Sequence, residues 1–166
     1  MAVEEYGNLV EKAFKIQNWN YSRDDREDKI IFTLDFERNG EYLTKCRVLV
    51  SDSGICDMEA CFPFKCPDDA ETGIRLSYYI AMCNFSKRYA TLRYDYEDGE
   101  IVNSYSFDMF LYMTPEFILS KFNQVNDIDE DDYKYIKDLC ESKAEDEAPV
   151  VQTVDSDKKN KYKIDL

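Results

Sequence analysis

Thiols and carboxylates are the side chains in this sequence that could bind a metal ion or carry out catalysis. The chain has six cysteines and 35 aspartates and glutamates, but no histidine. Cys56, Cys61 and Cys66 have four residues between neighbours, whereas structural zinc sites usually contain tight Cys-x-x-Cys pairs or mixed Cys/His sets. We therefore expect no metal site and interpret the cysteines as reduced thiols that pack like small hydrophobic residues.

The absence of histidine limits the enzyme mechanisms that this chain can use. Ser-His-Asp and Cys-His systems both need an imidazole as general base, and the sequence has none. The five glycines are scattered singly, so the sequence has no glycine-rich phosphate loop. Acidic residues are so abundant that pairs arise by chance and no single pair is informative. We predict a non-enzymatic protein without a cofactor, and keep a carboxylate-based enzyme with a divalent metal ion as the alternative.

One acidic stretch, Asp127–Asp138, begins with carboxylates at alternate positions, as calcium-binding loops do. However, Asp132 occupies the sixth position, where the sharp turn of such a loop needs glycine, and Asp138 replaces the bidentate glutamate at the twelfth. A helix start explains the pattern better. Asp129 would cap the helix, and the three acidic residues that follow it would lie in the first turn, where the helix dipole favours negative charge.

The charge of the chain bears on its partners and its location. The net charge is −14 and the isoelectric point is near 4.4, which argues against nucleic acids and anionic membranes because binding to phosphate needs clustered lysine and arginine. The first residues are acidic and amphipathic rather than typical of a secretory signal, and no apolar run approaches the roughly 20 residues that span a bilayer. We expect a cytoplasmic protein that contacts neither nucleic acid nor membrane.

Hydrophobic periodicity and turn residues predict one α+β domain over residues 1–145. An antiparallel sheet, made of a three-strand meander and a separate hairpin, would pack against helices in the order α-βββ-α-ββ-α-α. Trp19 and Tyr21 fall in a polar connection after the first helix. The predicted elements are a helix over Glu4–Ile16, strands over Lys29–Glu37, Glu41–Ser51 and Ile55–Phe64, a helix over Asp68–Ser86, a hairpin over Arg88–Phe107, a helix from Thr114-Pro115 to Val125, and a helix over Asp129–Ala144.

The pairing of the meander strands can be predicted from the separation of apolar and charged residues. Three-residue loops, with Gly40 and Gly54 in left-handed positions, place the apolar residues of all three strands on one face. In this register Arg47 lies across from Glu59 on the other face, and Cys46 lies opposite Ala60. Two-residue loops would instead bury lysine and arginine among aromatic rings, so we predict the three-residue loops.

For the hairpin over Arg88–Phe107 we predict a two-residue loop, because Asp98-Gly99 is a strong signal for such a turn. That turn would pair Leu92 with Tyr105 and Tyr94 with Asn103. One face of the hairpin would then be almost entirely aromatic and aliphatic. We expect these rings to face the helices, with the tyrosine hydroxyl groups near the rim.

The order of elements resembles the YbjN family, whose fold is similar to that of the type III secretion chaperones. The resemblance covers about residues 4–145 and rests on "IIFTLDFERNGEYLTKCRVLV", "YYIAMCNFSKRYATLRYDYEDGEIVNSYSF" and "TPEFILSKF". It implies a non-enzymatic binding or regulatory protein, chaperone-like and often dimeric, that recognises another protein. No catalytic residue is carried over from it.

Residues 146–166 form a charged tail outside the predicted domain. Acidic residues come first, lysines follow near the end, and "VVQTV" between them is a short β-prone run. Disorder is the simplest interpretation of this composition. The alternative is that the run Val150–Val154 docks on a sheet edge or on a partner chain.

The helix predicted over Asp68–Ser86 has apolar residues on two sides. One stripe consists of Ile74, Tyr78, Ala81 and Phe85, and the other of Leu76, Tyr79, Ile80 and Cys83. A surface helix needs one apolar stripe to pack on its own sheet, so the second is covered either by the Asp129–Ala144 helix or by another protomer. Following the resemblance, we expect a two-fold homodimer with the second stripe at its interface and with Leu76 and Tyr79 near the centre.

Overall fold

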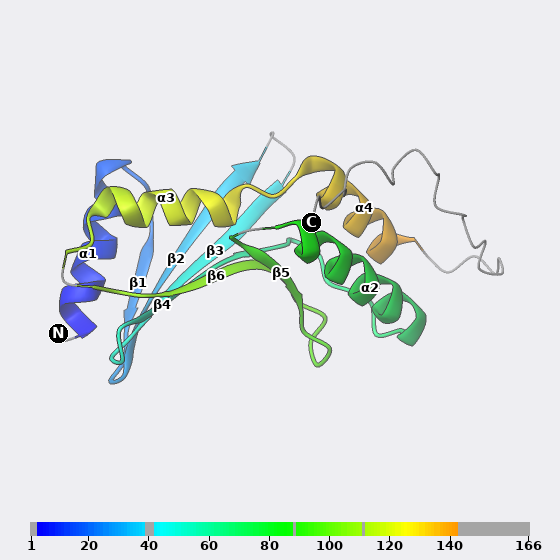
Figure 1. Ribbon diagram of the computed structural model, residues 1–166, viewed down its shortest axis with the longest axis horizontal. Coiled ribbons are helices and arrows are strands. Elements are labelled where there is room, and N and C mark those ends of the chain that lie inside the picture. The colour runs from blue at the N-terminus through cyan, green and yellow to red at the C-terminus, as the bar shows by residue number, and fades with distance from the viewer. Residues whose placement is uncertain (1–2, 39–41, 88, 111, 143–166) are drawn as a thin grey trace, which may run out of the picture.

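The computed structural model describes residues 3–38, 42–87, 89–110 and 112–142 of the 166-residue chain, and it confirms an α+β fold (Figure 1). The charged tail and Gly40 lie outside the described residues. In chain order the elements are α1 (Val3–Ile16), β1 (Ser22–Asp25), β2 (Lys29–Arg38), β3 (Tyr42–Ser51), β4 (Ile55–Cys61), α2 (Ala70–Ser86), β5 (Thr91–Tyr94), β6 (Ile101–Asp108), α3 (Pro115–Asn126) and α4 (Glu130–Glu141).

The six strands form one antiparallel sheet in the order β1-β2-β3-β4-β6-β5. Strand β1 was missed by the sequence prediction because its residues, SRDD, are all polar and show no apolar alternation. Ion pairs link this edge strand to α1: the Arg23 guanidinium lies 2.8 Å from the Glu4 carboxylate and 3.6 Å from the Glu11 carboxylate. Charged residues on an edge strand also discourage pairing with another sheet.

The helices divide between two parts of the sheet (Figure 1). Helices α1 and α3 pack on each other; α1 also covers β2 and β3, and α3 covers β4 and β6. Helices α2 and α4 lie side by side at the other end, where α2 packs on β5. One continuous hydrophobic core runs beneath all four helices, with Phe14, Met58 and Leu76 among its fully buried side chains.

The predicted register of the meander is confirmed. Phe32 pairs with Val48, and Cys46 pairs with Ala60, as three-residue loops require. On the other face Arg47 donates a hydrogen bond of 2.9 Å to Glu59, its partner across the strands. The separation of apolar and charged residues was therefore sufficient to fix this pairing, since a shift by one residue would reverse the faces.

Gly54 adopts the left-handed conformation that its loop requires, with φ of +84°. A side chain there would be strained, and its Cβ would lie 3.2 Å from the Tyr6 hydroxyl group. We expect Gly54→Val to lower the free energy of unfolding by more than ~1 kcal/mol, measured by urea denaturation. Asp52→Val is the matched control in the same exposed loop, and equal stability of the two variants would show that the loop tolerates the side chain.

The predicted register of the hairpin is wrong by two residues. Tyr94 pairs with Ile101 rather than with Asn103, and Leu92 pairs with Asn103 rather than with Tyr105. The reason is a longer turn. The Asp95 N–H donates to the Glu100 carbonyl at 2.9 Å, and the carboxylates of Asp95 and Asp98 each accept a backbone N–H inside the loop. A shift of two residues preserves the two faces, but it moves Tyr96 out of the strand and into the loop.

The predicted starts of α3 and α4 are confirmed by their capping residues, and α2 begins two residues later than predicted, at Ala70. Asp69 caps α2, and the Thr114 side chain accepts a hydrogen bond from the Phe117 N–H at the start of α3. Asp129 accepts hydrogen bonds from the backbone N–H groups of residues 131 and 132, at 2.9 and 3.2 Å. The acidic stretch is therefore the start of α4, as the sequence indicated, and α4 is the element that covers part of α2.

Candidate functional site

Helix α2 carries apolar residues on two opposite sides, of which one is buried and the other is exposed. Leu76 is fully buried and Ile80 is 8% exposed. Tyr79, on the same side, stacks on Tyr135 of α4 with ring centroids 4.1 Å apart. The side that was expected at a dimer interface is therefore packed within its own chain, against the core and α4.

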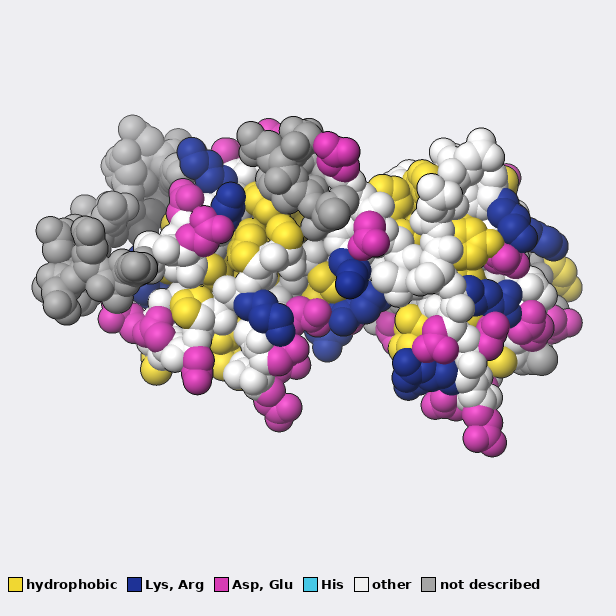
Figure 2. Space-filling model, turned by 180° about the vertical axis from the view of Figure 1, so that it is seen from behind, with side chains coloured by type: hydrophobic (Ala, Val, Ile, Leu, Met, Phe, Trp, Pro, Cys, Tyr) yellow, Lys and Arg dark blue, Asp and Glu magenta, His cyan; other side chains and the backbone are white. Residues whose placement is uncertain are grey.

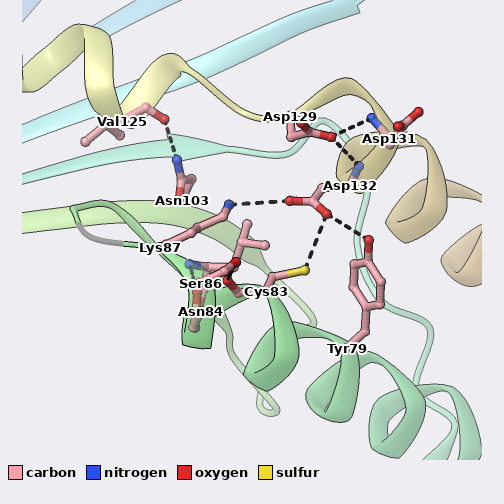
Figure 3. A network of polar contacts seen from close by, with 11 residues as sticks. Tyr79, Cys83, Asn84, Ser86, Lys87, Asn103, Val125, Asp129, Asp131 and Asp132 are labelled. Atoms are coloured by element: carbon pink, nitrogen blue, oxygen red, sulfur yellow. Dashed lines mark hydrogen bonds and ion pairs between the residues drawn. The ribbon is translucent and has the colours of Figure 1, made fainter. Parts of the chain in front are cut away.

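A polar network fixes α4 on this side of α2 (Figure 3). The Asp132 carboxylate, in the first turn of α4, accepts a hydrogen bond of 2.8 Å from the Tyr79 hydroxyl group and one of 3.4 Å from the Cys83 thiol. Lys87, which follows α2, places its Nζ 3.7 Å from the same carboxylate. The three contacting residues span about two turns, from Tyr79 to Lys87, and they hold the first turn of α4 against α2.

Two hydrogen-bond donors of this network, Tyr79 and Cys83, are held in their neutral forms. Burial raises the pKa of the Cys83 thiol to about 11, and the Asp132 carboxylate adds to the shift. Burial and the hydrogen bond to Asp132 also raise the pKa of Tyr79. A nucleophilic cysteine needs a lowered pKa, so these groups act as hydrogen-bond donors that hold the two helices together.

The structure thus places the four residues predicted for a dimer interface in contacts within one chain. The second stripe could have been covered by the last helix or by another protomer, and in the structure α4 covers it. The sequence could not decide between the two stripes, because both are apolar and spaced at helical intervals. Leu76 and Ile80 are buried in the monomer, so a homodimer would have to use another surface.

The opposite side of α2 is a row of exposed apolar side chains, which we call the outer stripe. A contiguous apolar surface of this kind commonly marks an interaction site. The sequence had placed this stripe towards the sheet, so the two sides are reversed. The outer stripe consists of Ile74 (69% exposed), Tyr78 (70%), Ala81, Met82 (57%) and Phe85 (79%).

A cleft of about 410 Å³ lies at the N-terminal end of the outer stripe, between residues 66–74 and the β5–β6 loop. Ile74 belongs to both features. Tyr94 and Tyr96 line the cleft with ring centroids 4.5 Å apart. The Tyr96 hydroxyl group is hydrogen-bonded to Ser77 of α2, so the loop is fastened to the helix and the cleft is continuous with the outer stripe.

Acidic side chains surround this cleft. Asp68, Asp69, Glu97 and Asp98 line it, and its lining contains no lysine or arginine among the described residues. The lower edge of the molecule, including the projecting tip of the β5–β6 loop, is largely acidic (Figure 2). The acidic cleft could not be predicted from the sequence, because it depends on the β5–β6 loop, for which we predicted a two-residue turn.

Two of the four carboxylates already have partners. Asp69 caps α2, and its hydrogen bonds with Thr72 lower the pKa of its carboxyl group. Asp98 accepts the Glu100 N–H, which lowers the pKa of its carboxyl group, and lies 3.5 Å from the Lys65 Nζ. Asp68 and Glu97 make no side-chain hydrogen bond or ion pair with the described part of the chain. They are the carboxylates available to a ligand.

Other chemistry has less support in the described residues. They include no group of three or more cysteine, aspartate and glutamate side chains arranged to hold a metal ion. Burial raises the pKa of the Cys46 thiol to about 12 and that of Cys61 to about 11. None of the described helices has the length and apolar character needed to cross a membrane. The outer stripe and its cleft are therefore the best-supported candidate site.

The sequence matches no protein-family model, and no curated protein matches it. The resemblance to the YbjN family accordingly stays a prediction.

Proposed function

We propose that this protein is a non-enzymatic binding module that recognises another protein through the outer stripe of α2. The observation that supports this most directly is the exposure of four large apolar side chains in one row, each by more than half. Burying a large apolar side chain contributes about 1.5–3 kcal/mol, so covering the stripe would supply on the order of 5 kcal/mol before the costs of association. Tyr78 and Phe85 are the aromatic anchors of the surface.

The occupant that fits this surface best is the apolar face of a different protein. An aromatic side chain buries about 150–250 Å², so the stripe offers on the order of 500 Å², below the roughly 800 Å² per partner of a stable complex. A partner must therefore also contact neighbouring surface, which includes the acidic lining of the cleft at the N-terminal end of the stripe. Two copies of a chain with a net charge of −14 would repel each other, which favours a different protein over the homodimer.

The experiment compares wild type with Tyr78→Glu, using Tyr112→Glu as the matched control because Tyr112 is 94% exposed and lies outside α2. A partner captured from the native host would be purified and titrated against all three proteins by calorimetry. We expect Tyr78→Glu to weaken binding at least tenfold, about 1.4 kcal/mol, and the control to bind like wild type.

Light scattering at micromolar concentration separates the two possible occupants. Wild type should have the molar mass of a monomer. A dimer that Tyr78→Glu dissociates would make a second copy of the chain the occupant of the outer stripe. Equal binding of the partner by wild type and Tyr78→Glu would remove the stripe from consideration as its docking surface.

A further inference from the structure

We infer that the cleft beside the outer stripe binds a lysine or arginine side chain, so that the partner is a protein segment with a basic residue at one end of an apolar face. This inference rests on the proposed function, because the cleft and the stripe share Ile74. It adds a chemical identity for the partner, which the apolar stripe alone does not provide.

The aromatic lining of the cleft suits a cation. Tyr96 is 70% exposed and its ring lies beside that of Tyr94, so a cationic group in the cleft can approach the faces of tyrosine rings. The chain uses the same contact elsewhere. The Lys121 Nζ lies 5.1 Å from the ring centroids of both Tyr89 and Tyr105.

The cleft is lined by negative charges, which attract a cation, and they come from both of its walls. Asp68 precedes α2, and Glu97 belongs to the β5–β6 loop, so a bound cation would lie between two carboxylates that make no side-chain hydrogen bond or ion pair with the described part of the chain. An anion is a poor fit even though a helix begins here. The Asp69 carboxylate already accepts the Glu71 and Thr72 N–H groups that an anion would need.

The positions of the two features also define the spacing of the partner's residues. The outer stripe runs from Ile74 to Phe85, which is about 16 Å along the helix axis at 1.5 Å per residue. A helical partner would cover this length with an apolar face of about three turns. Its basic residue would then lie at the end that reaches the cleft, beyond Ile74.

The test uses two synthetic amphipathic peptides labelled with a fluorophore. Both have a three-turn leucine face, and one has an arginine at each end of that face, so that either orientation brings a cation to the cleft. The other has citrulline, which is neutral and nearly isosteric, in place of both arginines. Affinities are measured by fluorescence anisotropy at 0.15 M NaCl. The proteins compared are wild type, Tyr78→Glu and the double variant Asp68→Asn/Glu97→Gln. A control double variant with the same change of charge, Glu27→Gln/Asp28→Asn, lies in the exposed β1–β2 turn.

We expect wild type to bind the arginine peptide about tenfold more tightly than the citrulline peptide. Asp68→Asn/Glu97→Gln should reduce this ratio to about twofold, whereas the control pair should keep it, which separates the cleft from the general acidity of the chain. Tyr78→Glu should weaken both peptides. Equal affinity of wild type for the two peptides, or a ratio that the cleft pair leaves unchanged, would overturn the cation site. Binding that Tyr78→Glu leaves unchanged, or no binding at all, would overturn the proposed function.

Discussion

Replacing Asn84 by leucine is expected to lower the free energy of unfolding by about 3 kcal/mol, because the Asn84 side chain completes the edge of the sheet. Its Nδ2 donates to the Leu92 carbonyl at 2.8 Å, and its Oδ1 accepts the Leu92 N–H at 2.8 Å. Leu92 is 1% exposed and lies on β5, the last strand of the sheet. Each buried backbone group left without a partner costs about 1–3 kcal/mol.

Urea denaturation of Asn84→Leu checks this value, and Ser86→Ala is the control. Ser86 lies in the last turn of the same helix, is exposed, and bonds only a carbonyl of its own helix, so its loss should change stability little. Asn84→Asp gives a second test, because a carboxylate cannot donate to the Leu92 carbonyl whereas a carboxylic acid can. The neutral form is favoured in the folded state, so its stability relative to wild type should improve as the pH falls towards about 4. A loss below ~1 kcal/mol for Asn84→Leu would show that water replaces the amide.

The parts of the fold that the sequence predicted correctly are those with redundant local signals. In the meander, apolar alternation over three strands and two glycine loops agree on one register. The helix starts have their own signals, such as Asp129 before three acidic residues. Where a single signal stood alone, it failed. Asp98-Gly99 resembles a two-residue turn, but the hydrogen bonds of Asp95 and Asp98 within the loop stabilise a longer one.

The candidate site could not be predicted in the same way, because it depends on which side of α2 another element covers. Both stripes of α2 have helical spacing, and propensity does not distinguish them. The difference comes from Asp132, 53 residues after Tyr79, whose carboxylate accepts the Tyr79 hydroxyl hydrogen. Placing α4 by this contact leaves Tyr78 on the outside. Contacts with the core and with α4, distant in the sequence, therefore determine which apolar surface is available for binding.

Gly99→Ala is expected to destabilise the protein by about 3 kcal/mol, combining backbone strain with a direct clash. Gly99 has φ of +75°, which disfavours any residue with a side chain. An added Cβ would also lie 2.5 Å from the carbonyl oxygen of Cys66. That oxygen belongs to backbone rather than to a flexible side chain, and the Cys66 N–H is itself bonded to the Gly99 carbonyl at 2.9 Å, so neither segment can move away without losing a hydrogen bond.

Two further variants separate the causes of this loss. Asparagine tolerates positive φ better than alanine does but carries the same Cβ, so a Gly99→Asn variant as unstable as Gly99→Ala would identify the clash as the larger cause. Gly73→Ala is the matched control on the opposite wall of the cleft. Its Cβ would meet the Tyr94 side chain, whose hydroxyl oxygen is the nearest atom at 3.3 Å. Alanine favours a helix interior by about 1 kcal/mol over glycine, so the stability of Gly73→Ala should stay close to that of wild type. If Gly99→Ala unfolds at the same urea concentration as Gly73→Ala, the β5–β6 loop is not fastened to Cys66, and the cleft would have no fixed second wall.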